Sequence, residues 1–234
     1  MGNAILIKAK RLLKKGFKFF KVPIFWGNLR RLKPVSNVFG YDRGKQSIAR
    51  YYIDNFIERN STCIHGAILE IGDNSYTLKH GKNIEKSDVL HVQGSPTATI
   101  IADLTNAYQI PDNTYDCIVI PQTFQFIYDM NSAIEHCYRI LKPGGILLAT
   151  FTGISQISRF DMDRWGDYWR LTSLSAEKLF STYFKANKIK IETHGNVLVA
   201  NAFLQGLASH ELTKKELNYR DENYEVVITL EAQK

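Results

Sequence analysis

The chain has 234 residues, of which 44% are hydrophobic and 23% are charged, as expected for one globular domain with appendages. Its three cysteines, Cys63, Cys117 and Cys137, form no CxxC pair, so no structural metal or disulfide framework is expected, and a reduced, cytoplasmic protein is favoured. The net charge of +7 is concentrated near the start of the chain.

The first 41 residues contain ten basic side chains and no acidic one. These are Lys8, Lys10, Arg11, Lys14, Lys15, Lys18, Lys21, Arg30, Arg31 and Lys33. The remainder of the chain is slightly acidic, with twenty basic against twenty-three acidic residues. This distribution argues against an enzyme with a basic nucleic-acid cleft, so nucleic acid is disfavoured as a partner.

Residues 4–20 are predicted to form an amphipathic helix with lysines opposite Leu and Phe side chains. Two interpretations stay open. In the first, residues 1–33 bind an acidic partner or an anionic membrane surface, and the latter would place the protein at the inner face of the membrane. In the second, the helix packs on its own domain and leaves its basic face in solvent. We expect a basic arm at 1–35 and a globular domain at 36–234.

After the arm, alternating apolar stretches and turn residues predict an α/β domain. The loop Phe39–Gly44 is rich in side chains suited to binding. The predicted strands are 68–71, 84–88, 97–102, 115–120, 146–151, 189–193 and 226–230. The predicted helices are 47–58, 76–82, 132–141, 173–184 and 196–212, with a short helix after the capping box at 213–216.

The first predicted strand ends at a turn suited to ligand binding. Gly72 follows the apolar run at once, and Asp73 and Asn74 are turn formers. In an open α/β sheet this turn lies at the carboxyl edge, where ligands bind, and glycine lets a ligand approach the backbone closely. Asn74 tolerates positive φ and can replace a glycine there, whereas Tyr76 cannot do so cheaply. Glu70 places a carboxylate beside the turn.

Three further polar residues are expected near the same edge. Asp88 ends the second predicted strand, eighteen residues after Glu70, the spacing at which doubly wound sheets deliver an acid to ribose hydroxyls. Asp103 follows the third strand, and Gln122 follows the fourth.

These residues resemble motif I of the class I S-adenosylmethionine-dependent methyltransferases, although Asn74 and Tyr76 replace its later glycines. The resemblance is stronger at Pro111–Ile120 and in the Arg139-Ile-Leu-Lys-Pro-Gly-Gly-Ile-Leu-Leu segment, which look like the later motifs of the small-molecule type. It extends to a bacterial group associated with polysaccharide biosynthesis. The resemblance implies a Rossmann-like, doubly wound, mainly parallel seven-stranded sheet with an antiparallel last strand, plus N-terminal helices.

The resemblance also implies S-adenosyl-L-methionine as the cofactor and assigns residues to it. Glu70, Gly72, Asp73 and Asn74 would hold the methionine end. Asp88 and Val89 would meet the ribose, and Asp103 and Leu104 the adenine. Gln122 would lie near the methyl group. Methyl transfer is an in-line displacement in which the protein supplies position and desolvation, so no nucleophile or metal is required.

The acceptor is expected among polar and aromatic residues, most of them after the fifth strand, where this fold usually places substrate elements. Aromatic faces with carboxylates suit a sugar or another polyol, so a small molecule or glycan, methylated on oxygen, is expected. The candidate substrate residues are Arg43, Tyr51, Asp161, Trp165, Trp169 and Arg170. Two tryptophans could instead form a structural lid. Asp161, His91 and His194 are candidate bases, and none is assigned.

Two other functions remain as alternatives. The altered glycine loop permits a methyltransferase-like binding module without catalysis, although Asp88 and Asp103 argue against it. A nicotinamide-dependent dehydrogenase is disfavoured because two of the three fingerprint glycines are missing. Pro121–Phe124 lacks the pattern of a nucleic-acid amino-methyltransferase.

Overall fold

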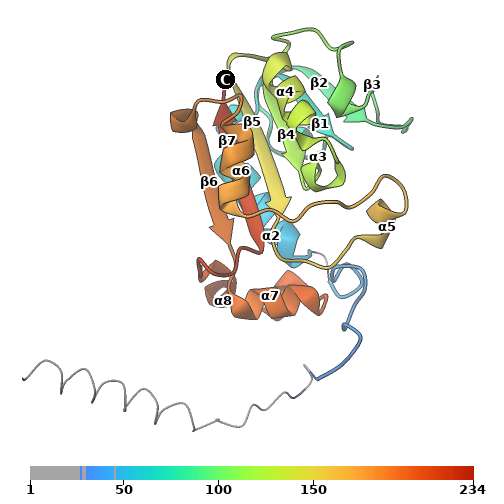
Figure 1. The fold of residues 1–234 in the computed structure, drawn as a ribbon, viewed down its shortest axis with the longest axis vertical. Helices are drawn as coiled ribbons and strands as arrows, with labels where there is room; N and C mark the ends of the chain where they lie inside the picture. Colours follow the sequence, from blue (N-terminus) through green and yellow to red (C-terminus); the bar gives the residue numbers. More distant parts are fainter. Residues whose placement is uncertain (1–26, 28–29, 45) are drawn as a thin grey trace, which may run out of the picture. The chain divides into compact units, whose positions relative to one another are not determined.

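The computed structural model describes residue 27, residues 30–44 and residues 46–234. The chain divides into two units, Met1–Lys33 and Pro34–Lys234, and the second is called the body below (Figure 1). The predicted helix at 4–20 lies outside the described residues. Among the described residues, no helix has the length and hydrophobicity needed to span a bilayer.

The body is built around a seven-stranded sheet in the order β3-β2-β1-β4-β5-β7-β6. The strands are β1 Gly66–Ile71, β2 Ile84–His91, β3 Ile100–Ile101, β4 Tyr115–Pro121, β5 Leu141–Thr152, β6 Ile189–His194 and β7 Val227–Gln233. β7 runs antiparallel to both of its neighbours, and the pairs among β1 to β5 are parallel. The predicted fold class is therefore confirmed.

Helices cover both faces of the sheet (Figure 1). α4 (Met130–Ile140) and α6 (Ser173–Phe180) pack on one face, where Ile134 and Phe180 are fully buried. α2 (Ile48–Arg59) packs on the other face through Phe56 and Ile57. Because each helix presents one apolar stripe and each buried strand is apolar on both sides, this layering buries all of these surfaces at once.

Four shorter helices complete the body. They are α3 Ser75–His80, α5 Arg159–Met162, α7 Val197–Leu204 and α8 Lys214–Asn218. Thr213 and Glu216 form the predicted capping box of α8. α5 was not predicted, because its single turn within a polar segment gives no periodic signal.

Several predicted boundaries were wrong. β5 begins at Leu141 rather than at 146, and α6 ends at Phe180 rather than at 184. β2 continues past Asp88 to His91, because Val89 and Leu90 pair with β1. β3 contains only Ile100 and Ile101. The helix predicted at 196–212 ends at Leu204. Two residues later Gly206 takes a φ of +70 and approaches Ser36 so closely that a Cβ would lie 2.2 Å from that carbonyl oxygen.

Candidate functional site

A cavity of about 530 Å³ opens at the carboxyl edge of the sheet, above β1, β2 and β4. We call it the cofactor cleft, because the resemblance implies that the cofactor binds at this edge of the sheet. Its walls combine strand-end residues, the turn after β3 and the segment that follows β5. They include Ile71, Gly72, Leu90, His91, Ala102, Asp103, Leu104, Thr105, Gln122, Phe126, Ile127, Asp161, Trp165 and Tyr168. This is the edge at which ligands bind in open α/β sheets.

Gly72 forms the floor of the cleft where β1 ends. Its φ is +88, a left-handed value that favours glycine, and its N–H donates to the Leu90 carbonyl at 3.0 Å. A Cβ built on Gly72 would meet no atom within 4 Å. The backbone is therefore open to a ligand, as the sequence predicted for this turn.

Glu70 has a different place from the one expected. Its carboxylate is 1% exposed and accepts from the N–H groups of Tyr76 and Thr77 and from the Thr77 hydroxyl, at 3.0, 2.9 and 2.7 Å. Burial raises the pKa of Glu70, and these bonds oppose that rise. Glu70 thus fixes the start of α3 and the loop after Gly72, and it is not among the residues that line the cleft.

The altered glycine positions also differ from expectation. Asn74 has a φ of −110 at the N-cap of α3, so it does not replace a glycine in the left-handed region. Tyr76 is buried within α3, and its hydroxyl donates to Asp54 at 3.0 Å and accepts from Arg50. The loop is short because α3 begins at Ser75, and Asp73 accepts from the Ser75 N–H at 2.8 Å.

Asp88 lies inside β2, three residues before its end. Its carboxylate accepts from Tyr115 at 2.7 Å and Thr99 at 2.9 Å, and it pairs with Lys86 at 2.7 Å. Burial alone would raise the pKa of Asp88, but these partners outweigh burial and lower it. Neither Asp88 nor Val89 is among the described residues that line the cleft. His91 lies at the strand end instead. The sequence signal for this longer strand is the apolar pair Val89 and Leu90, which follows Asp88.

Asp103 and Leu104 lie in the cleft, as predicted, where β3 leads into a 3₁₀ turn at Leu104–Asn106. One carboxylate oxygen of Asp103 caps this turn by accepting from the N–H and the hydroxyl of Thr105, both at 2.8 Å. Leu104 is buried beside it. The turn therefore presents one acid next to an apolar surface, which suits a flat heterocycle with polar edges.

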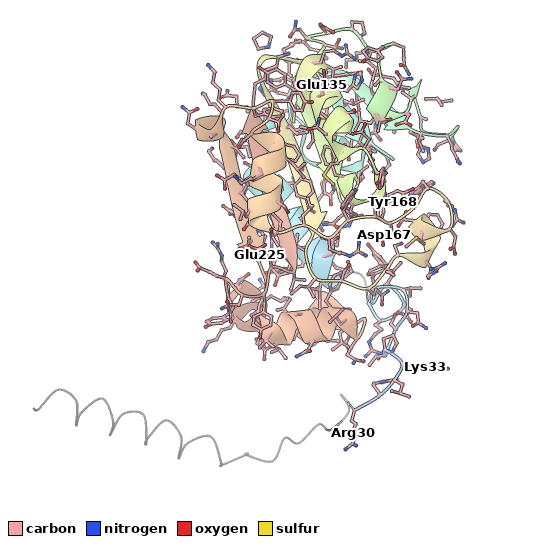
Figure 2. The ribbon with its side chains drawn as sticks, viewed as in Figure 1. Arg30, Lys33, Glu135, Asp167, Tyr168 and Glu225 are labelled. Carbon is pink, nitrogen blue, oxygen red and sulfur yellow. The ribbon has the colours of Figure 1, made fainter. Side chains whose placement is uncertain are left out.

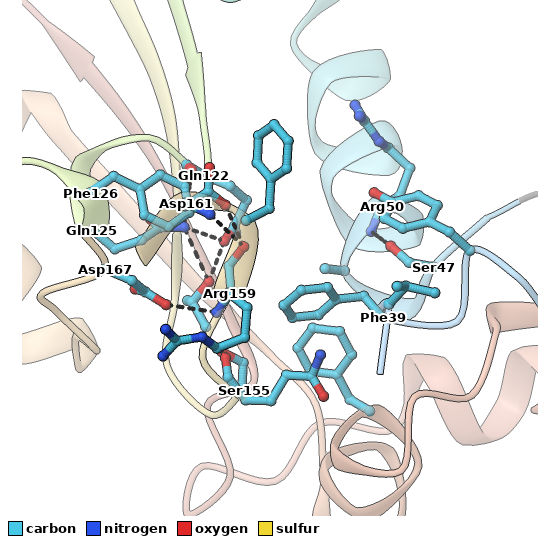
Figure 3. A pocket seen from close by; sticks show the side chains of 18 of the residues that line it. Phe39, Ser47, Arg50, Gln122, Gln125, Phe126, Ser155, Arg159, Asp161 and Asp167 are labelled. Carbon is cyan, nitrogen blue, oxygen red and sulfur yellow. Dashed lines mark hydrogen bonds between the residues drawn. The ribbon is translucent and has the colours of Figure 1, made fainter. Parts of the chain in front are cut away.

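A second cavity, of about 480 Å³, adjoins the first (Figure 3). We call it the acceptor cavity, because the resemblance implies an acceptor beside the cofactor. In Figure 3, Phe39, Ser47 and Arg50 form one side, and Gln122, Gln125, Phe126 and Asp167 form the other. Other lining residues include Val38, Tyr41, Ala49, Ile53, Ser155, Arg159, Phe160, Asp161, Arg170 and Phe203. Gln125 and Phe203 were not among the predicted site residues, because neither belongs to a recognisable motif.

Gln122, Phe126 and Asp161 line both cavities, so they mark the junction. Gln122 has a φ of +48, a strained value for a residue with a Cβ. The side-chain amide of Gln125 donates to the backbone and side-chain oxygens of Gln122, each at 3.0 Å, and the Thr152 hydroxyl also donates to the side-chain oxygen. These bonds hold Gln122 where the end of β4 meets the two cavities.

The segment from Asp161 to Arg170 forms a wall of both cavities, and Figure 2 labels Asp167 and Tyr168 within it. Asp167 is bound twice by Arg170, at 2.6 and 2.8 Å. Trp165 donates to Asp161 at 3.1 Å and lies edge-on to His91, with ring centroids 6.2 Å apart. The structure thus brings Asp161, Trp165 and Arg170 together.

The other predicted substrate residues lie elsewhere. Arg43 forms an ion pair with Glu211, and Trp169 stacks on Tyr128. Tyr51 donates to Asn218 at 2.9 Å and lines a third cavity, of about 640 Å³, together with His194. Arg43, Tyr51 and Trp169 are not among the described residues that line the cofactor cleft or the acceptor cavity.

Residues 73–149 match the family model described as a methyltransferase domain, about a third of the chain. The ubiquinone/menaquinone biosynthesis C-methyltransferase UbiE of Haemophilus ducreyi is 41% identical over 63 residues, which is 24% of this chain and 24% of that protein. The chain thus spans about a quarter of the length of this curated relative.

Solved structures show the same fold. The N-methyltransferase NodS from Bradyrhizobium japonicum WM9, in complex with S-adenosylhomocysteine, has a TM-score of 0.52 and 13% identity, covering 86% of this chain and 94% of that one. The S-adenosylmethionine-dependent methyltransferase from Archaeoglobus fulgidus has a TM-score of 0.52 and 13% identity, covering 82% and 96%. At these identities the likeness establishes the fold. The match of residues 73–149 to the methyltransferase-domain model supports an enzyme of that class.

Proposed function

We propose that the chain binds S-adenosylmethionine in the cofactor cleft and transfers its methyl group to a small molecule in the acceptor cavity. The observation that carries this proposal is the junction at Gln122 and Asp161, where two cavities of ligand size meet at the carboxyl edge of the sheet. Methyl transfer between two bound molecules requires adjoining sites of this kind, because the reacting atoms must approach in line.

The residues of the cleft fit this cofactor. The open backbone at Gly72 accommodates its amino-acid portion, since even a Cβ would find free space there. His91, which lines the cleft at the end of β2, would meet the ribose hydroxyls. Asp103 and Leu104 offer a hydrogen-bond acceptor and an apolar surface to the adenine. When bound, the cofactor supplies an electrophilic methyl group on a sulfonium.

The chain's own contribution is positioning, exclusion of water and acceptance of a proton. Trp165 and Tyr168 cover the cleft from the segment after β5. Gln125, in the acceptor cavity, has a buried amide oxygen with no hydrogen-bond partner among the described residues, and an acceptor hydroxyl would satisfy it. Asp161 is the carboxylate that lines both cavities. We therefore assign it as the group that accepts the proton when the methyl acceptor is a hydroxyl oxygen. His194 lies in the third cavity and takes no part.

Isothermal titration with S-adenosylhomocysteine tests cofactor binding. Replacing Asp103 with Ala removes a ligand contact and should weaken binding by about tenfold, or about 1.4 kcal/mol. Asp221→Ala is the matched control, because Asp221 caps a similar exposed turn by accepting from the Asn223 N–H at 2.9 Å. Equal affinities in the two variants would remove Asp103 from the site. A wild-type chain that binds no cofactor at millimolar concentration would favour the non-catalytic binding module.

A further inference from the structure

The acceptor cavity is polar at its inner end and apolar at its mouth. Gln122 and Asp161 lie at the junction with the cofactor cleft. Val38, Tyr41 and Phe160 also line the cavity, yet their side chains are 50%, 55% and 59% exposed. A molecule that fills this cavity therefore meets polar groups where methyl transfer would occur and apolar groups where it leaves the protein.

The apolar surface continues beyond the mouth. Ile157, which adjoins the cavity residues Gln156 and Ser158, is half-exposed, and so is Leu204, the last residue of α7. We call Val38, Tyr41, Ile157, Phe160 and Leu204 the apolar rim. Its three segments are tied together. The Gln156 side chain donates to the Asn37 carbonyl at 3.0 Å, and the Ser36 N–H donates to the Gln205 carbonyl at 3.1 Å.

A cationic group contacts the rim, and basic residues precede the rim in the sequence. The Arg164 guanidinium lies over the Phe160 ring, 3.6 Å from its centroid. The ten basic residues of the first 41 positions precede Val38 in the chain, and no acidic residue stands among them. An exposed apolar patch and a polybasic segment are the two signals that together hold a protein on an anionic bilayer, where either alone binds weakly.

We propose that the apolar rim docks on an anionic membrane and that the acceptor is an amphiphile drawn from it, with its polar head at the Gln122–Asp161 junction and its apolar chain leaving across the rim. The acceptor part of this inference rests on the proposed methyl transfer, whereas the docking part does not. A glycan acceptor fits as the head group of such a lipid, and a water-soluble glycan does not use the rim.

Flotation of the full chain with phosphatidylcholine vesicles, with and without phosphatidylglycerol, tests the docking. Ile157→Glu places a charge on the rim outside the cavity lining and should lower binding to the anionic vesicles by about tenfold. Leu174→Glu is the matched control, since Leu174 is an apolar residue, 61% exposed, on α6, and it should leave binding unchanged. Both variants should melt like the wild type, because both positions are exposed.

A full chain with Lys14, Lys15 and Lys18 replaced by Glu should lose its preference for phosphatidylglycerol. Adding Ile157→Glu to this variant should still lower its remaining binding to vesicles. Docking is overturned if the wild type does not float, or if Ile157→Glu floats as well as Leu174→Glu. The first result would show that the chain does not bind the membrane. The second would show that only the basic arm binds it.

Transfer of radiolabelled methyl from S-adenosylmethionine to a total lipid extract or to a water-soluble extract tests the acceptor class. Label in the lipid fraction supports an amphiphile, and label only in the water-soluble fraction overturns it. Label in neither fraction, with docking intact, contradicts the proposed methyl transfer and leaves the docking surface standing.

Discussion

Gly72→Ala should have two effects that can be measured separately: a loss of stability from backbone strain and a loss of ligand affinity. In the free protein the new Cβ meets nothing within 4 Å, so the cost to folding comes from the φ of +88 alone. Placing alanine in the left-handed region costs about 1 kcal/mol. For a chain of this size, that lowers the melting temperature by roughly 2–4 °C. The same Cβ stands on the floor of the cofactor cleft, where it would displace a ligand that packs against the backbone.

The chain provides a matched control for this change at the opposite edge of the sheet. Gly144 has a φ of +84, its Cβ would also meet nothing within 4 Å, and its N–H donates to the Lys234 carbonyl at 3.0 Å, just as that of Gly72 donates to Leu90. Gly144→Ala should therefore cost the same stability while leaving any cleft ligand untouched.

We expect calorimetric melting to give equal shifts for the two variants, and titration with S-adenosylhomocysteine to give an affinity loss of at least about tenfold for Gly72→Ala alone. Unchanged affinity in Gly72→Ala would show that no ligand packs on this turn. Equal losses of affinity in both variants would trace the effect to stability instead, and either outcome would refute the reasoning.

Three further predictions concern buried polar groups. Glu70→Gln should cost about 2 kcal/mol in urea unfolding, because an amide cannot accept from all three donors at the start of α3; an unchanged midpoint would contradict this. Asp88→Asn should cost a similar amount through lost partners while cofactor affinity changes less than about twofold, and a tenfold loss of affinity would return Asp88 to the site. Burial lowers the pKa of His194 to about 4, so the unfolded chain binds its proton more tightly. Stability should be full above about pH 6.5 and fall by at most about 3 kcal/mol towards pH 4, and His194→Gln should flatten this fall if the burial of His194 causes it.

The parts of the fold that local sequence determines were predicted well. Gly72 follows an apolar run, so the end of β1 and its turn are specified within a few residues. The apolar run after Gly145 likewise located β5, although β5 begins earlier, at Leu141. The order and direction of the strands followed from the resemblance, and the structure confirms them.

Predictions failed where distant contacts decide the outcome. Asp88 was placed at a strand end on its spacing of eighteen residues from Glu70, yet Tyr115, Thr99 and Lys86 satisfy its carboxylate inside β2. Such partners come from other strands and cannot be identified from local pattern. The early end of α7 likewise depends on the approach of Ser36 to Gly206, across 170 positions of the sequence.

The acceptor cavity shows a third limit of prediction from sequence. Arg50 and Tyr51 are neighbours on α2, but successive residues of a helix point in directions about 100° apart. Arg50 therefore lines the acceptor cavity while Tyr51 lines the third cavity with His194. Tyr51 was a candidate substrate residue, but sequence alone does not indicate which face of α2 reaches the acceptor cavity.

A crystal structure of the chain with S-adenosylhomocysteine tests the central claim most directly. The account predicts the adenine beside Asp103 and Leu104, the amino-acid portion over Gly72, and the sulfur facing the Gln122–Asp161 junction. Ligand density in the third cavity beside His194, or a sulfur directed away from the acceptor cavity, would contradict it.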